Sequence, residues 1–261
     1  MDLQLKDTVA IVTAASRGLG RACALQLAAE GAKVVVAARD AARLADVVRE
    51  CEDAGGEAVA VAADLVDEGA CERVVDQAIA HFGRLDSLVV STPGPPATPC
   101  EQVGDEDFRA AIEMNCVIPM RLTRLALPHM RQQVGGRVVY IGTIGVRTVQ
   151  PNMVLSNASR LALLGYMKTM ALEVAADNIL LNMVAPGPLA TERMDELARQ
   201  TAAHQGISVE SAAEQWVAEV PLRRMGEAGD LATLVALLVS PTCSYTTGAV
   251  IPVDGGKASA Y

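Results

Sequence analysis

Residues 8–20 read TVAIVTAASRGLG. The apolar, β-branched run at 8–12 is typical of a buried strand, and helical periodicity begins at Gly18, directly after a short turn. Gly18 and Gly20 allow a backbone to approach a ligand closely. A helix that starts there offers free N–H groups and a positive dipole end to a pyrophosphate. A glycine pair at such a turn also suits tight packing alone, but its place after the first strand favours a phosphate-binding turn.

The alternation of short strands and longer helices continues through the chain. We expect strands at 8–12, 33–37, 57–62, 86–91, 137–142, 179–184 and 249–253. We expect helices at 18–30, 40–54, 67–82, 105–132, 155–176 and 229–239, and a polar, helical segment at 191–220. Continuous apolar strands that alternate with helices indicate a parallel sheet covered on both faces. Since we find no linker and no internal repeat, we expect residues 1–261 to form one doubly wound α/β domain with a seven-stranded parallel sheet.

The composition excludes several classes of partner. The chain is acidic, with 22 Lys and Arg against 31 Asp and Glu, and it has no basic run. It therefore lacks the electrostatic footprint of a protein that binds nucleic acid or an anionic membrane. Aromatic residues make up only 3% of the chain, so platforms for base stacking are not expected either.

The cysteines and the first residues indicate the compartment. The six cysteines show no C-x-x-C spacing, and the three histidines lie far apart. We therefore expect free thiols in a reducing compartment and no metal site. Residues 1–7 lack the basic and then apolar pattern of a secretory signal. The uncharged run at 231–253 could span a membrane, but Pro241 and Gly248 interrupt it. These features predict a cytoplasmic protein without a membrane partner.

Several motifs resemble those of the short-chain dehydrogenase/reductase family. Residues 13–20 resemble its T-G-x-x-x-G-x-G motif, with the small residue Ala14 in place of the first glycine. Asp64 matches the acid that contacts adenine, and Asn115 precedes Thr143 at the spacing of the structural Asn and the catalytic Ser. Residues 182–191 match N-x-x-x-P-G-x-x-x-T, and PVDGG at 252–256 is similar to the C-terminal signature of bacterial ketoreductase-like members.

The resemblance covers essentially the whole chain and implies a Rossmann-type, three-layer sandwich with strand order 3-2-1-4-5-6-7. It implies an oxidoreductase that interconverts a carbonyl and an alcohol on a small organic or acyl-type substrate, with a nicotinamide cofactor. It also implies a homo-oligomer, either a dimer or a tetramer. The residues that it assigns to cofactor binding are Thr13, Ser16, Arg17, Gly18, Leu19, Gly20, Arg39, Asp64, Leu65, Ser91, Arg160, Pro186, Gly187 and Thr191.

The choice between NAD(H) and NADP(H) depends on the end of the second strand. An acid at that point usually holds the adenosine ribose hydroxyls of NAD, but Ala38 stands there and Arg39 follows it. Arg17 lies inside the glycine turn. Two guanidinium groups suit a 2′-phosphate, so we expect NADP(H) to be favoured over NAD(H). The alternative is that both arginines are solvated, with Asp40 available to pair with Arg39.

The chain departs from the family at its catalytic motif. The resemblance implies a Ser, a Tyr and, four residues after the Tyr, a Lys; Thr143, Ser156 and Arg160 occupy these positions. Tyr140 lies on a strand, and Tyr166 lies on another side of the helix from Ser156. No neighbouring tyrosine therefore restores the motif by a small shift in register.

This departure predicts altered proton delivery. The resemblance implies catalytic roles for Asn115, Thr143, Ser156 and Arg160. Thr143 and Ser156 keep hydroxyls for a substrate oxygen, and Arg160 keeps a positive charge beside the ribose, but an arginine does not relay protons. A missing general acid costs roughly 10²–10⁴ in rate. Two alternatives stay open: a non-redox enzyme that uses the same pocket, and a cofactor-binding or interaction protein that has lost the redox chemistry.

The segment at 191–220 corresponds to the region that caps the substrate in this family. We expect its charged residues to face solvent rather than a ligand; they are Glu192, Arg193, Asp195, Glu196 and Arg199. Met153, Met183 and Met194 flank the predicted pocket, and they suit either an apolar substrate site or the core.

Overall fold

The structure is a computed structural model that describes residues 1–133 and 135–259. Its main sheet contains seven strands in the order β3-β2-β1-β4-β5-β6-β9, and every pairing is parallel. The strands are β1 (Val9–Thr13), β2 (Lys33–Ala38), β3 (Glu57–Ala62), β4 (Ser87–Val90), β5 (Gly136–Ile141), β6 (Ile179–Pro186) and β9 (Val250–Val253). The expected sheet and strand order are confirmed. Two short strands that were not expected, β7 (Leu189–Ala190) and β8 (Gly226–Glu227), form a separate parallel pair.

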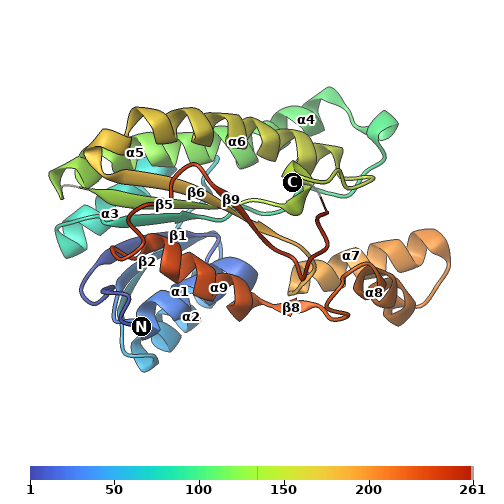
Figure 1. Ribbon diagram of the computed structural model, residues 1–261, viewed down its shortest axis with the longest axis horizontal. Coiled ribbons are helices and arrows are strands. Elements are labelled where there is room, and N and C mark those ends of the chain that lie inside the picture. Colours follow the sequence, from blue (N-terminus) through green and yellow to red (C-terminus); the bar gives the residue numbers. More distant parts are fainter. Residues whose placement is uncertain (134, 260–261) are drawn as a thin grey trace.

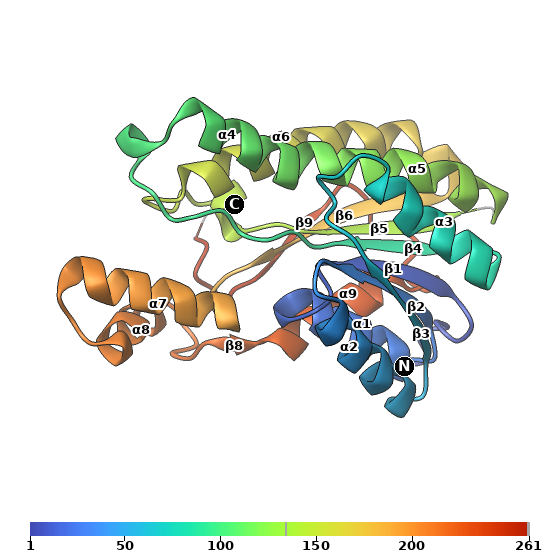
Figure 2. The same ribbon diagram turned by 180° about the vertical axis from the view of Figure 1, so that it is seen from behind.

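Helices cover both faces of this sheet (Figures 1 and 2). The helices are α1 (Gly18–Ala29), α2 (Ala41–Asp53), α3 (Ala70–Phe82), α4 (Asp105–Ile112), α5 (Ile118–Gln132), α6 (Val154–Glu173), α7 (Glu192–Gln205), α8 (Val209–Ala218) and α9 (Ala228–Val239). One apolar cluster joins the sheet to α3, α5 and α6, and a second joins it to α1, α2 and α9. The expected three-layer sandwich is therefore confirmed. None of the described helices is both long and apolar enough to cross a membrane.

The central strands are buried on both faces, which explains their unbroken apolar sequences. Every residue of β1, β4 and β5 is buried, whereas the edge strand β3 has no fully buried residue. The chain leaves β1 toward β2 on one side, and β4 lies on the other side. Parallel strands end at the same edge, so the loops after β1 and β4 diverge there and leave a crevice.

The predicted continuous helix at 105–132 is interrupted. A π-helical turn, Glu113–Val117, separates α4 from α5 and contains Asn115. The Asn115 amide donates a hydrogen bond to the Ala111 carbonyl (3.2 Å), and its side-chain oxygen accepts one from the Thr92 hydroxyl (2.7 Å). Single π-helical turns are frequent at functional sites. This one holds Asn115 directly behind the loop that follows β4.

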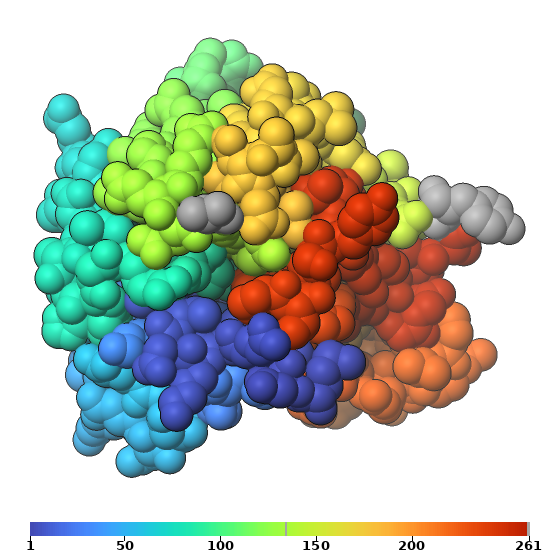
Figure 3. Space-filling model, turned by 60° about the vertical axis from the view of Figure 1, so that its left-hand side comes forward, coloured from blue at the N-terminus to red at the C-terminus, as the bar shows by residue number. Residues whose placement is uncertain are grey.

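The capping segment forms two helices, α7 and α8, which project beyond the carboxyl edge of the sheet (Figure 1). At the opposite end of the fold, the N-terminal residues lie beside the segment that follows α9 (Figure 3). There the Ser240 hydroxyl donates a hydrogen bond to the Leu3 carbonyl (2.6 Å). Strand β6 continues two residues past its expected end, because Ala185 and Pro186 pair with β9.

Candidate cofactor and active site

The turn between β1 and α1 keeps the backbone shape that the glycine motif requires. Ala14, at the first glycine position, adopts a left-handed conformation with φ of 47°. This conformation costs an L-residue about 1–2 kcal/mol. Gly18 is also left-handed, with φ of 56°, and a Cβ atom on Gly20 would collide with the Ala14 carbonyl. The turn therefore brings the N-terminus of α1 close to the chain that leaves β1.

A cavity of about 580 Å³ opens at the carboxyl edge of the sheet, between this turn and α7. Most of the predicted site residues line it: Ser16, Arg17, Gly18, Leu19, Gly20, Arg39, Asp64, Leu65, Ser91, Thr143, Ser156, Arg160, Pro186, Gly187 and Thr191. Thr13 and Asn115 do not line it and lie behind its wall. The resemblance assigns Thr13 to cofactor binding. In the structure its buried hydroxyl donates to the Ser91 carbonyl (2.7 Å) and accepts from the Ser91 N–H (3.0 Å), which joins β1 to β4 at the crevice.

Two hydroxyl groups lie where a substrate oxygen could be held. Thr143 follows β5, and its hydroxyl oxygen accepts a hydrogen bond from the Gly145 N–H at 3.2 Å, so its proton remains free to donate. Ser156 lies in the first turn of α6, only 4% exposed. Its hydroxyl makes no hydrogen bond to any residue that the structure describes. Both side chains line the cavity.

Arg160 lies one turn further along α6 and is buried. Its guanidinium donates to the Ile141 carbonyl at 2.7 Å and to the Thr92 carbonyl at 3.5 Å. No carboxylate of the described chain forms an ion pair with it. Burial lowers the pKa of Arg160 to about 10, so the side chain remains charged at neutral pH. The site therefore contains a buried positive charge at the inner wall of the cavity.

Thr92 connects these groups, and sequence analysis did not identify it. Its carbonyl accepts from Arg160, and its hydroxyl donates to Asn115. The only signal in the sequence is its place directly after Ser91, where the loop leaves β4. Its partners come from α6 and from the π-helical turn, and no local pattern indicates them.

Of the described residues, no tyrosine and no lysine lines the cavity. Tyr140 is fully buried in β5, where its hydroxyl lies 2.7 Å from that of Thr123 and burial raises its pKa. Burial raises the pKa of Tyr166 to about 12, and its buried hydroxyl has no hydrogen-bond partner in the described chain and does not line the cavity. Neither hydroxyl can replace the missing acid at neutral pH.

The far end of the cavity is rich in arginine. Arg17, Arg39 and Arg43 line it, together with Asp40 and Asp64. The Arg39 side chain is 71% exposed, and its guanidinium lies 3.7 Å from the Asp64 carboxylate. The alternative pairing of Arg39 with Asp40 is not found, because Asp40 caps α2 through the Arg43 N–H (3.1 Å) and pairs with the Arg43 side chain (3.6 Å). Arg43 was not predicted as a site residue.

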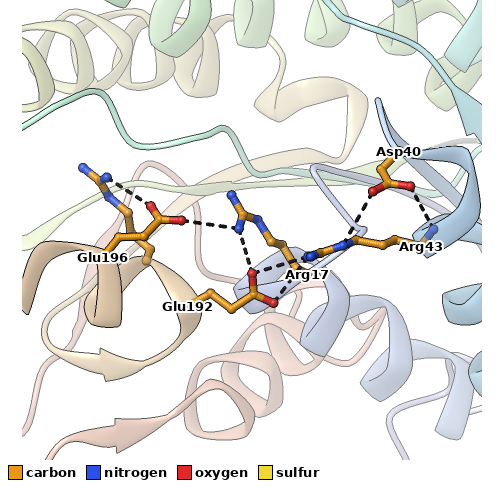
Figure 4. A network of polar contacts seen from close by, with 6 residues as sticks. Arg17, Asp40, Arg43, Glu192 and Glu196 are labelled. Atoms are coloured by element: carbon orange, nitrogen blue, oxygen red, sulfur yellow. Dashed lines mark hydrogen bonds and ion pairs between the residues drawn. The ribbon is translucent and has the colours of Figure 1, made fainter. Parts of the chain in front are cut away.

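The expectation that the charged residues of α7 face solvent is wrong for Arg193 and Glu196, which are half-buried and line the cavity. Glu192 is exposed, but it also lines the cavity. The Glu192 and Glu196 carboxylates pair with Arg17 at 2.7 and 3.5 Å (Figure 4), and Arg193 donates to the Pro95 carbonyl at 2.6 Å. Asp195 and Arg199 are exposed as expected. Of the three methionines expected to flank the pocket, Met153 and Met194 line the cavity, whereas Met183 is buried beneath Gly142.

A doubly wound parallel sheet with a glycine turn after β1 and a cavity at its switch point is the architecture of dinucleotide-binding proteins. Comparison with known proteins agrees. Residues 13–258 match the family described as enoyl-(acyl carrier protein) reductase. The chain belongs to the short-chain dehydrogenase/reductase family of oxidoreductases.

Its relatives include enzymes with different substrates. The chain is 30% identical to 3-oxoacyl-(acyl-carrier-protein) reductase of Thermotoga maritima, over 97% of this chain and 99% of that protein. It resembles the crystal structure of L-sorbose reductase from Gluconobacter frateurii complexed with NADPH and L-sorbose, with a TM-score of 0.95, 28% identity and full coverage of both chains. It also resembles 7α-hydroxysteroid dehydrogenase complexed with NADH and 7-oxo glycochenodeoxycholic acid, with a TM-score of 0.89, 30% identity, and coverage of 98% of this chain and 96% of that one.

The cavity fits a nicotinamide dinucleotide. A Cβ atom added to Gly18 would project toward the Thr191 side chain and lie in contact with its methyl group at 3.9 Å. A glycine there leaves room for a pyrophosphate at the N-terminus of α1. The arginine-rich end lies beside Asp64, and the end with Thr143 and Ser156 lies beside Pro186 and Gly187. The two ends therefore match the adenosine and nicotinamide halves of such a cofactor.

Proposed function

We propose that this protein is an NADP(H)-dependent oxidoreductase that interconverts a carbonyl and an alcohol on a small organic or acyl-type substrate, with altered proton delivery. The observation that carries the proposal is the meeting of Thr143, Ser156 and Arg160 on the wall of a cavity that fits a dinucleotide. A bound nicotinamide supplies or accepts the hydride. The substrates of its relatives, a 3-oxoacyl group and L-sorbose among them, define the range of carbonyl compounds to be tested.

The side chains of the site position a substrate oxygen and stabilise its charge. Thr143 donates its free hydroxyl proton to that oxygen, and Ser156 approaches it from α6. Arg160 lies beside the nicotinamide ribose, and its buried charge stabilises negative charge that develops on the oxygen. Asn115 orders a water molecule behind the cavity wall. The hydroxyl of Ser156 and the guanidinium of Arg160 are both too weakly acidic to supply a proton near neutral pH. The proton therefore comes from water or from the substrate itself.

The preference for NADP(H) follows from Arg17 and Arg39 and predicts a difference in affinity. We expect NADPH to bind about tenfold more tightly than NADH, because a charged hydrogen bond to the 2′-phosphate is available only to NADPH. Replacing Arg39 by Ala should remove most of this difference and leave the affinity for NADH unchanged. Fluorescence titration of both cofactors measures it. Equal affinities for the two cofactors in the parent protein would overturn the assignment.

Transfer of an isotope label separates the proposed function from its two alternatives. With NADPH that carries deuterium at the transferred position, an oxidoreductase places the label in the product alcohol, which mass spectrometry detects. A non-redox enzyme that uses the same pocket turns over without moving the label. A protein that has lost its chemistry binds the cofactor and turns over none of the carbonyl compounds. Label in the product supports the proposal, and turnover without label contradicts it.

Three further proposals concern the whole molecule. Residues 1–261 form one domain, since strands from residue 9 to residue 253 share one sheet. The expected dimer or tetramer and the expected cytoplasmic location stay predictions.

A further inference from the structure

A carboxylate of this chain occupies the arginine-rich end of the cavity. The Glu192 side chain lies between two guanidinium groups (Figure 4). One of its oxygens is 2.7 Å from Arg17 Nη1, and both are 3.4 Å from Arg43 Nη1. Glu196, one turn further along α7, approaches Arg17 at 3.5 Å. Arg17 belongs to the turn after β1, Arg43 to α2 and both glutamates to α7, so three separate elements meet at these ion pairs.

The chemistry of this arrangement is that of an anion site. Two guanidinium groups that share one carboxylate can also share a phosphate, because both anions accept paired N–H donors. The hydrogen bond from Arg17 lowers the pKa of Glu192, so its carboxylate is ionised at neutral pH. A phosphate group that uses the same donors must therefore displace it.

The position of Glu192 links this site to the rest of the cavity. It is the first residue of α7 and follows Thr191 directly. Met194 and Leu197, on the same helix, also line the cavity. The ion pairs thus tie α7, and α8 packed against it, to the turn that receives the cofactor. Loss of these ion pairs therefore changes how α7, which covers the substrate end, is held against the turn.

We propose that Glu192 is an internal competitor for the 2′-phosphate of the cofactor, and that displacement of its carboxylate removes the contact of α7 with Arg43 and the closer of its two contacts with Arg17. The inference rests on the proposed preference for NADP(H). Glu192 thereby sets how strongly the site discriminates between cofactors with and without a 2′-phosphate. It also couples occupation of the adenosine end to the position of the helices over the substrate end.

The test compares two nucleotides that differ at the 2′ position. Adenosine 2′,5′-bisphosphate carries the 2′-phosphate, 5′-AMP lacks it, and neither contains nicotinamide. Their dissociation constants are measured by calorimetry for the parent protein, for Glu192→Gln and for Asp195→Asn. The last is a matched control, because Asp195 is exposed in the same turn of α7 and forms no ion pair in the described chain. It loses the same charge from the same turn of α7.

We expect Glu192→Gln to tighten binding of the bisphosphate about three- to tenfold, as removal of two half-exposed ion pairs suggests. Binding of 5′-AMP should change less than twofold, and Asp195→Asn should change neither. Trp216, the single tryptophan of the chain, lies half-buried in α8 and reports on the position of α7 and α8. Its emission should change when the parent binds the bisphosphate. That change should be much smaller in Glu192→Gln, in which the ion pairs that the bisphosphate would displace are already absent.

The outcomes distinguish this inference from the proposed function. If the parent prefers the bisphosphate but Glu192→Gln binds it no more tightly, Glu192 is not a competitor and this inference alone fails. If Asp195→Asn tightens binding as much as Glu192→Gln, the effect is one of overall charge, and the inference fails as well. If the parent binds both nucleotides equally, the preference for NADP(H) is overturned and the inference falls with it.

Discussion

Replacing Thr143 by Ala is expected to lower kcat/KM by about two to three orders of magnitude, since loss of one oxyanion donor costs about 2.7–4 kcal/mol. Thr143 has this effect because its hydroxyl oxygen already accepts from the Gly145 N–H, which orients the hydroxyl proton toward other acceptors. No described residue that lines the cavity donates a proton near neutral pH. Stabilisation of the negative charge on the substrate oxygen therefore contributes more to the rate. Steady-state kinetics with a substrate found by nicotinamide absorbance measures the loss.

Ser156→Ala is the matched comparison. It removes a hydroxyl from the same cavity, but one that is neither the acid nor oriented by a partner in the described chain. We expect a loss of about tenfold or less, the value of one neutral hydrogen bond. The relative size of the two losses in kcat/KM shows which hydroxyl contributes more to catalysis. If Ser156→Ala abolishes turnover while Thr143→Ala leaves it intact, Ser156 is the catalytic group and the proposed roles are reversed.

The pH dependence of the parent provides an independent check. We expect no ionisation of a tyrosine and lysine pair in the profile of kcat/KM near neutral pH. Activity should fall as the pH rises toward the lowered pKa of Arg160, about 10, because deprotonation removes the buried positive charge. A steep ionisation close to neutral pH would contradict the assignment of the proton to water or substrate.

Much of the site was predictable from the sequence because it lies at the ends of strands. Parallel strands end at one edge, so a glycine turn after the first strand and a Thr after the fifth had to meet there. Gly18 and Thr143 line one cavity for this reason. The strand order itself came from the family resemblance, since alternation of strands and helices does not fix it.

The rest depends on contacts that no local pattern contains. Glu192 and Arg17 are 175 residues apart, and their ion pair forms only because α7 folds back over the turn. The π-helical turn at Glu113–Val117 leaves the apolar periodicity of its flanking helices intact, so the sequence indicated one continuous helix. Thr92 is similar, because its two partners are brought to it by α6 and by that π-helical turn.

Restoring the family's acid is expected to raise the rate of carbonyl reduction. The double variant Ser156→Tyr with Arg160→Lys should reduce a ketone about 10²–10⁴ times faster than the parent, the usual contribution of a general acid. The rest of the site is retained, since Thr143 and Thr92 already line the cavity and Asn115 lies behind its wall. Ser156 opens on the cavity, so a tyrosine ring has space to enter it. A lysine keeps the positive charge beside the tyrosine, which lowers the pKa of its hydroxyl.

The two single variants and the pH profile show whether the gain has this cause. Ser156→Tyr alone places the ring beside a guanidinium that is held by the Ile141 carbonyl, so we expect a smaller gain than in the pair. Arg160→Lys alone supplies no acid and should give none. The double variant should acquire a new ionisation in its kcat/KM profile, because the lysine lowers the pKa of the neighbouring tyrosine. The double variant could bind NADPH and melt like the parent but reduce the ketone no faster. In that case the missing proton relay is not what separates this chain from an ordinary ketone reductase. That result would count against the redox proposal and for the non-redox alternative.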